Sequence, residues 1–183
     1  MIQPATGTLL IADPFLKDPN FSRTVVLLCN HEHEGSFGFV MNRRFEFDLD
    51  ELLTHFEGYP LPVYYGGPVQ KDTIHFLHQY PDLIPGGQKI LDDVYWGGDF
   101  ETLTELIKKG SIDTQKIRFY IGYSGWDSGQ LQNELTEKTW LTATATSKLI
   151  FHPNIDEIWK DSLTHLGGDF KMLINFPIDP QLN

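Results

Sequence analysis

Two short motifs in this chain contain residue types that could do chemistry. His31-Glu32-His33 places two imidazoles on one side of an extended chain, which would suit zinc if a third ligand lay nearby. Gly122-Tyr123-Ser124-Gly125-Trp126 approaches the Gly-x-Ser-x-Gly turn of serine hydrolases, but tryptophan stands where the second glycine is needed. No His-Glu-x-x-His pattern is present. We therefore predict no catalytic residue and no metal, with His31 and His33 as the residues to consider for either.

A ligand-binding site is the better prediction. Arginine and asparagine side chains flank two apolar runs, Val25–Cys29 and Phe37–Met41. Three glycine motifs, which begin at Gly66, Gly97 and Ser124, each follow a predicted strand, and the last two precede a predicted helix. Backbone N–H groups at such positions can hold an anion. The candidate ligand-binding residues are Arg23, Asn42, Arg43, Gly66, Gly67, Tyr123 and Trp126, and Arg23 and Arg43 are predicted to converge on one or more glycine turns.

Hydrophobic periodicity and turn residues indicate the elements that must position these side chains. Many short strands with three or four scattered helices predict an α+β fold with a mixed sheet, and the strand count is high enough for that sheet to curl toward a small barrel. A tight turn is predicted at Ser124–Gly129. The predicted strands are Gly7–Ala12, Val25–Cys29, Phe37–Met41, a short strand within Pro62–Val69 that leads into a Gly-Gly-Pro turn, Thr73–Tyr80, two within Lys89–Phe100, Lys116–Tyr123 and a half-buried strand within Leu141–Phe151. The predicted helices are Leu49–Phe56, Phe100–Lys109, one from Gln130 and one from Asn154 or Asp156 to about Leu166.

Composition narrows the class of protein. A length of 183 residues predicts a single domain, 1–183. The formal net charge of −11 is spread along the chain without a basic run, which argues against direct nucleic-acid binding, although a basic patch around Arg23, Arg43 and Arg44 is left open. No apolar run approaches the ~18 residues of a membrane span. A single cysteine, Cys29, fits a reducing compartment, so we expect a cytoplasmic protein.

Several long blocks carry a family resemblance. They are GTLLIADPFLKDPNFSRTVVLLCNHEHEGSFGFVMNR, YYGGPV, WGGDF and IGYSGWDSGQLQNEL. Together they resemble the AlgH (YqgE) family of uncharacterised bacterial proteins over nearly the whole chain. The resemblance implies a compact α+β fold, with a bifurcated, partly barrel-like sheet surrounded by helices. It brings no catalytic residue with it. The family usually has alanine at the position of Ser124, so this serine is predicted to be a small turn residue.

The predicted function is binding. We expect a non-enzymatic binding or regulatory protein that acts through a small anionic ligand or a protein partner and needs no cofactor. Aromatic residues such as Tyr95, Trp96, Tyr123 and Trp126 flank the glycine motifs, and an exposed aromatic patch there would indicate a protein-binding surface. Two alternatives stay open. One is a hydrolase that uses His31 or His33, and the other is a transcriptional regulator, as some family members are labelled.

Overall fold

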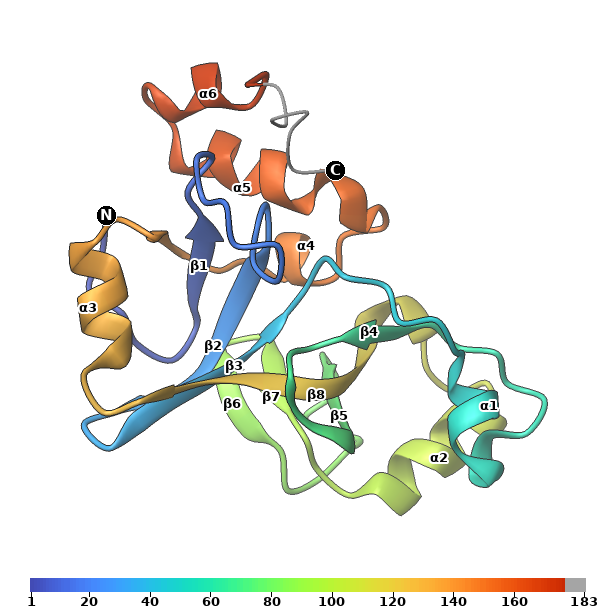
Figure 1. Cartoon of the computed structure of the whole chain (residues 1–183). Helices are drawn as coiled ribbons and strands as arrows, with labels where there is room; N and C mark the ends of the chain where they lie inside the picture. The colour runs from blue at the N-terminus through green and yellow to red at the C-terminus, as the bar shows by residue number, and fades with distance from the viewer. Residues whose placement is uncertain (177–183) are drawn as a thin grey trace.

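One curled sheet of nine strands organises the chain. The computed structural model describes residues 1–176, and in it the strands follow the order β6-β7-β5-β8-β3-β2-β1-β9, with β4 paired to β8 off this path (Figure 1). All pairings are antiparallel except that of β4 with β8. The strands are β1 (Thr8–Ala12), β2 (Val25–Glu32), β3 (Gly35–Val40), β4 (Val63–Tyr65), β5 (Val69–His78), β6 (Gln88–Leu91), β7 (Val94–Trp96), β8 (Ile117–Asp127) and β9 (Trp140–Thr144).

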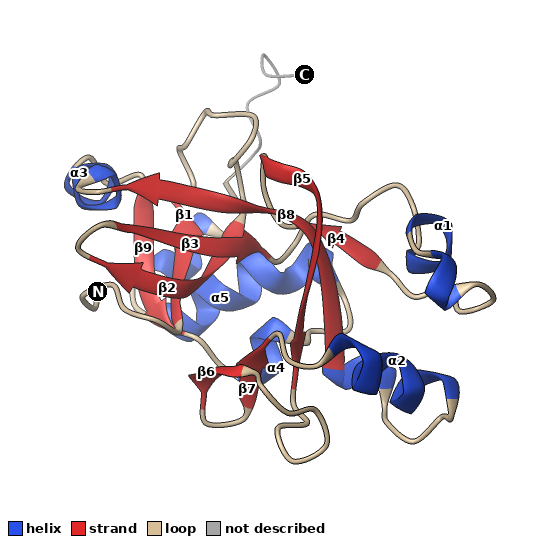
Figure 2. Cartoon of the chain, turned by 90° about the horizontal axis from the view of Figure 1, so that it is seen from below, coloured by secondary structure: helices blue, strands red, loops and turns tan. Residues whose placement is uncertain are grey.

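Helices surround this sheet, as Figure 2 shows. Three of them have seven to nine residues, and three are single turns of four residues. The predicted α+β class with a mainly antiparallel, curled sheet is confirmed. No helix among residues 1–176 is long and apolar enough to cross a bilayer. The helices are α1 (Leu49–Leu52), α2 (Phe100–Lys108), α3 (Gln130–Thr136), α4 (Ser147–Ile150), α5 (Ile158–Leu166) and α6 (Phe170–Leu173).

The buried side chains form three clusters. Two of them lie on opposite faces of the β1–β2 region, because successive residues of a strand point to opposite faces. Leu9 and Ile11 join an inner cluster with Trp159 of α5, whereas Leu10 joins an outer cluster with Leu131 of α3. The β1–β2 region is therefore covered on both faces, which explains the continuous apolar sequence of its strands. A third cluster lies beneath α2 and α1 and against β5 and β8.

β8 links the two halves of the sheet. Its first half pairs with β5 and β4, and its end, Ser124 to Asp127, pairs with β3. Gly67 permits the close approach of the β4–β5 connection to this strand, since a Cβ there would lie 2.2 Å from the Tyr123 carbonyl. The strand is thus held from several directions over eleven residues. Figure 1 shows it crossing the centre of the molecule.

Three local predictions need correction. The predicted tight turn at Ser124–Gly129 is wrong for Ser124 to Asp127, because pairing with β3 keeps this segment extended. The predicted half-buried strand is shorter, and its residues other than Thr144 are buried on both faces. β9 buries Trp140 in the outer cluster and Leu141 in the inner one, and α4 follows it. The predicted helix Leu49–Phe56 is divided into α1 and a 3-10 turn at Thr54–Phe56.

Candidate functional site

A cavity of about 620 Å³ opens where β3, β5, β7 and β8 meet. Figure 1 shows these strands side by side near the middle of the sheet. We call this 620 Å³ cavity the aromatic cavity, because most of its apolar lining comes from ring side chains. Its size falls within the range of small-molecule sites. The lining consists of Asn30, Gly35, Ser36, Phe37, Val69, His75, Trp96, Tyr123, Gly125, Trp126, Asp127 and Gln130.

Most ring contacts in the aromatic cavity are edge to face, and that between His75 and Trp96 is tilted. The centroid of Phe37 lies 4.9 Å from that of Trp96 and 5.9 Å from that of Tyr123, both in T-shaped contacts. The His75 ring lies 6.0 Å from Trp96 and 6.2 Å from Tyr123. These four rings are only partly buried. They therefore present a preformed aromatic wall to a ligand, held in geometry that aromatic pairs favour.

His75 contributes the one imidazole ring of this wall. Its Nε2 atom is buried and has no hydrogen-bond partner among the described residues. Burial lowers the pKa of His75, so the imidazole is neutral at physiological pH. A neutral imidazole offers one donor and one acceptor. An unpaired buried nitrogen costs free energy, and a ligand group bonded to it would remove that cost.

Trp126 is positioned from behind by α3. Its indole Nε1–H donates to a Glu134 carboxylate oxygen at 2.9 Å, and Trp140 donates to the same oxygen at 2.8 Å. The Gln130 amide donates to the other carboxylate oxygen of Glu134 at 3.1 Å. Both indoles are buried. One carboxylate thus fixes the orientation of the ring that closes this side of the cavity.

A serine of the cavity lining is hydrogen-bonded to one of the predicted histidines. Ser36 and His31 face each other across the β2–β3 hairpin, and Ser36 Oγ lies 2.6 Å from His31 Nδ1. Within residues 1–176, no carboxylate is hydrogen-bonded to His31 to orient the ring. His33 is exposed at the hairpin turn, and its backbone carbonyl accepts a bond from the Ser128 hydroxyl at 2.8 Å.

Arg23 and Asn42, which were predicted to bind ligand, are placed beside the start of β2. The Arg23 guanidinium lies over the Trp159 ring, 4.8 Å from its centroid, and donates to the Phe176 carbonyl at 2.6 Å. The Asn42 side chain accepts from the Val25 N–H at 3.0 Å and donates to the Arg23 carbonyl at 2.8 Å. Neither residue lines the aromatic cavity.

Arg43 and Gly67 come together in a smaller cavity of about 190 Å³ beside Phe21. The Arg43 guanidinium donates to the Ser22 carbonyl at 2.7 Å. Gly66 packs against β8, and its carbonyl accepts from the Ser124 hydroxyl at 3.1 Å. Ser124 is therefore a buried strand residue with a satisfied hydroxyl. Of the predicted residues, Tyr123 and Trp126 share the aromatic cavity, and Arg43 and Gly67 share the small one.

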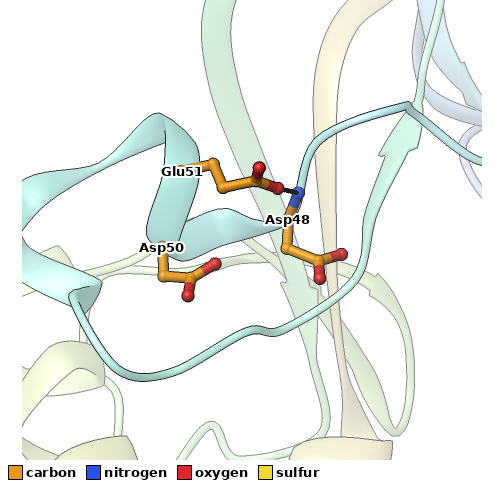
Figure 3. A group of neighbouring side chains, drawn as sticks. All are labelled: Asp48, Asp50 and Glu51. Carbon is orange, nitrogen blue, oxygen red and sulfur yellow. Dashed lines mark hydrogen bonds between the residues drawn. The ribbon is translucent and has the colours of Figure 1, made fainter.

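One group of acidic side chains has the spacing of a metal site. Among the described residues, Asp48, Asp50 and Glu51 are the only three His, Cys, Asp or Glu side chains close enough to share an ion. Figure 3 shows Glu51 reaching back to the Asp48 backbone nitrogen, at 2.8 Å. Arg44 forms an ion pair with Asp48. Two of the three carboxylates are thus used for helix capping and charge pairing, and we assign the group a structural role.

Phe37, His75 and Trp96 join the cavity from three separate strands. Their sequence signals were the alternating Phe37-Gly38-Phe39 run, a histidine within the predicted strand Thr73–Tyr80, and an aromatic beside a glycine pair. Each signal also fits an ordinary core strand. Only strand order brings them together, which is why sequence reasoning did not combine them.

The fold and this site define an α+β protein built on a curled sheet with an aromatic cavity at its centre. The AlgH-like family matches residues 9–171, and this chain belongs to that family. It is 45% identical over 177 residues to a UPF0301 protein of Chlorobium limicola, covering 97% of this chain and 95% of that protein. It is 40% identical over 178 residues to a UPF0301 protein of Cytophaga hutchinsonii, covering 97% and 98%.

Solved structures share the fold. The solution structure of the AlgH protein from Pseudomonas aeruginosa superposes with a TM-score of 0.73 at 29% identity, covering 97% of this chain and 99% of that one. The crystal structure of a Corynebacterium diphtheriae protein gives a TM-score of 0.79 at 20% identity, covering 96% and 94%. The predicted family assignment is therefore confirmed, and the predicted fold is shared with these structures.

Proposed function

We propose that this protein is a non-enzymatic binding protein whose ligand is a small planar molecule held in the aromatic cavity. The observation that carries the proposal is the wall of four partly exposed rings, one of which, His75, has a buried and unpaired Nε2. A largely apolar cavity with a few convergent polar groups is the usual form of a ligand site. Tyr123 and Trp126, two of the residues predicted from sequence, belong to it.

The chemistry of the lining limits the ligand. Edge-to-face rings accept another flat ring at low cost, since aromatic pairs prefer such contacts. His75 supplies one hydrogen bond without a charge. Among residues 1–176, Asp127 is the only lining residue with a formal charge, and no Lys or Arg lines the cavity. We therefore expect a neutral or cationic ring compound, such as a nitrogen heterocycle, in this cavity.

We also propose a cellular location and a mode of action. The buried free thiol of Cys29 suits the reducing cytoplasm, where we place the protein. A regulatory role would act through ligand occupancy or a protein partner. Direct contact with DNA is disfavoured, because a formal charge of −11 repels phosphates on average. The binding function requires no cofactor.

The experiment is a thermal-shift and calorimetric titration with indole, adenine and benzimidazole as probes. A probe at 100 times its dissociation constant stabilises the folded state by about 2.7 kcal/mol, which is readily detected. His75→Phe keeps the ring wall but removes the hydrogen bond, and we expect it to weaken binding about fivefold or more. His55→Phe, the same change at an exposed position, is the matched control. Binding by none of the three probes, or equal affinity in His75→Phe, would contradict the proposal.

A hydrolase is the second candidate function, and the contact between Ser36 and His31 favours it. The serine lines the cavity, and the imidazole lies within hydrogen-bond reach as a base. Binding is the stronger reading, because a cross-strand Ser–His pair needs no catalytic role and no carboxylate orients His31 in the described chain. Hydrolysis of p-nitrophenyl acetate that is lost in both Ser36→Ala and His31→Gln would establish the enzyme. Unchanged hydrolysis in Ser36→Ala would exclude this dyad.

A further inference from the structure

A third cavity, of about 470 Å³, is lined in part by Tyr64 of β4 and Arg118 of β8. It is formed by the loop before β4, the start of β8 and the segment that follows α4. Apolar side chains make up much of its wall, and two basic residues, Lys116 and Arg118, belong to its lining. The residues that matter for the argument are Leu61, Tyr64, Lys116, Arg118, Phe151 and Pro153. We call it the Arg118 cavity.

Arg118 is held rigidly in this wall. Its guanidinium lies over the Tyr64 ring, 4.9 Å from the centroid, and one Nη donates to the Tyr64 hydroxyl. The other Nη donates to the carbonyl of His152. Stacking on an aromatic face together with two hydrogen bonds fixes the plane of the fork. A fixed fork loses little further freedom when it binds a planar, bidentate partner.

The charge of Arg118 is not compensated by the described chain. A guanidinium has five N–H donors, and the two hydrogen bonds above use two of them. Its Nε atom is buried and has no partner, and within residues 1–176 no carboxylate forms an ion pair with Arg118. A desolvated charge is costly unless it is paired. A ligand oxyanion would supply that pairing.

The described ionisable groups near Arg118 do not neutralise its positive charge. Burial raises the pKa of Tyr120, so this neighbouring phenol stays neutral. Lys116 lines the same cavity and adds a second cation, whose ammonium lies 5.8 Å from the centroid of the Tyr80 ring. Asp113 also lines the cavity, but it is exposed and accepts a bond from the Gln115 N–H at 2.9 Å.

From these observations we propose that the Arg118 cavity binds the carboxylate of a small organic acid with an apolar body. The fork of Arg118 matches the planar, two-oxygen shape of a carboxylate. The side chains of Leu61, Phe151 and Pro153 would contact the apolar body. A singly charged acid suits a protein of formal charge −11 better than a polyanion, which the overall field would repel. This site is separate from the aromatic cavity and does not depend on the function proposed there.

The test is calorimetric and NMR titration of the full chain with benzoate, and with benzyl alcohol as the neutral probe of similar shape. We expect benzoate to bind at least about tenfold more tightly, since a hydrogen bond to a charged group is worth roughly 1.5–3 kcal/mol. Amide signals of the Arg118 cavity should shift, and those of the aromatic cavity should not. Equal affinity for both probes, or benzoate shifts confined to the aromatic cavity, would overturn the proposal.

Three variants make the assignment to Arg118 decisive. Arg118→Lys keeps the charge but loses the fork, and we expect about tenfold weaker benzoate binding. Lys116→Gln changes an exposed side chain, so it keeps the fold, and it should weaken binding several-fold even if the Arg118 variant is unstable. Lys109→Gln removes the same charge at the exposed end of α2 and should bind benzoate unchanged. Unchanged benzoate binding in Lys116→Gln and in folded Arg118→Lys would refute the site.

Discussion

Replacing Glu134 tests whether its carboxylate holds the tryptophan side of the aromatic cavity in place. Glu134→Ala leaves the indole donors of Trp126 and Trp140 without their acceptor. An unsatisfied buried donor costs about 1–3 kcal/mol, which gives about 2–6 kcal/mol for two. Because Glu134 is itself partly exposed, water can reach part of the vacated space. We therefore expect the free energy of unfolding to fall by about 3 kcal/mol, measured by urea denaturation with circular dichroism.

The charge change must be separated from the lost hydrogen bonds. Glu137→Ala removes the same charge from an exposed position just beyond α3, and should lie within about 0.5 kcal/mol of the unchanged protein. Glu134→Gln keeps an acceptor oxygen and should cost about 1 kcal/mol. Near-ultraviolet circular dichroism should change in Glu134→Ala because the indoles are released. If Glu134→Ala is as stable as Glu137→Ala, the reasoning fails.

Three further outcomes are expected. Burial lowers the pKa of both His75 and His78, so the unfolded chain takes up their protons at a higher pH than the folded protein does. The free energy of unfolding is therefore highest above the unfolded pKa of about 6.5, and it falls as the pH drops toward the folded pKa. The free energy of unfolding should thus fall from pH 7 to 5 by at most about 1.4 kcal/mol per unit for each histidine, and His78→Gln should flatten that slope in urea titrations. Gly67→Ala would place a Cβ 2.2 Å from the β8 backbone and should cost about 3 kcal/mol or more in thermal unfolding, whereas Gly97→Ala, with nothing within 4 Å, should cost about 1. Cys29 is fully buried and burial raises its thiol pKa, so it should resist Ellman's reagent until the protein unfolds; rapid labelling of the folded protein would contradict this.

Elements with a local cause could be predicted from the sequence. α2 has Asp99 before it, an apolar stripe within it and Gly110 after it, and the structure confirms the helix. The continuous apolar run Val25–Cys29 predicted a buried strand, and the structure has β2 there. The segment at Ser124 has strong turn residues, yet it is extended because β3 pairs with it. A pairing partner about 90 residues away in the chain overrides local preference, as β-propensity depends on context.

The candidate sites were harder to predict than the elements. Tyr123 and Trp126 could be named because they flank a glycine motif, but the remaining rings come from other strands. Arg118 gave a signal that sequence reasoning did not use. It is the single charge within the segment Ile117–Tyr123, and a partly buried charge needs a partner. What sequence could not supply was strand order, which decides whose side chains share a cavity.

The placement of β1 has a consequence for synthesis of the chain. β1 pairs with β2 on one edge and with β9 on the other, Ala12 lying opposite Trp140. At about 5–20 residues per second, a ribosome needs roughly 6–25 seconds to add the residues between them. During that time the apolar β1 edge has no native partner, and an open edge is a template for aggregation. Nascent chains that stall before residue 140 should therefore depend on chaperones. This dependence should end once β9 is complete and pairs with β1.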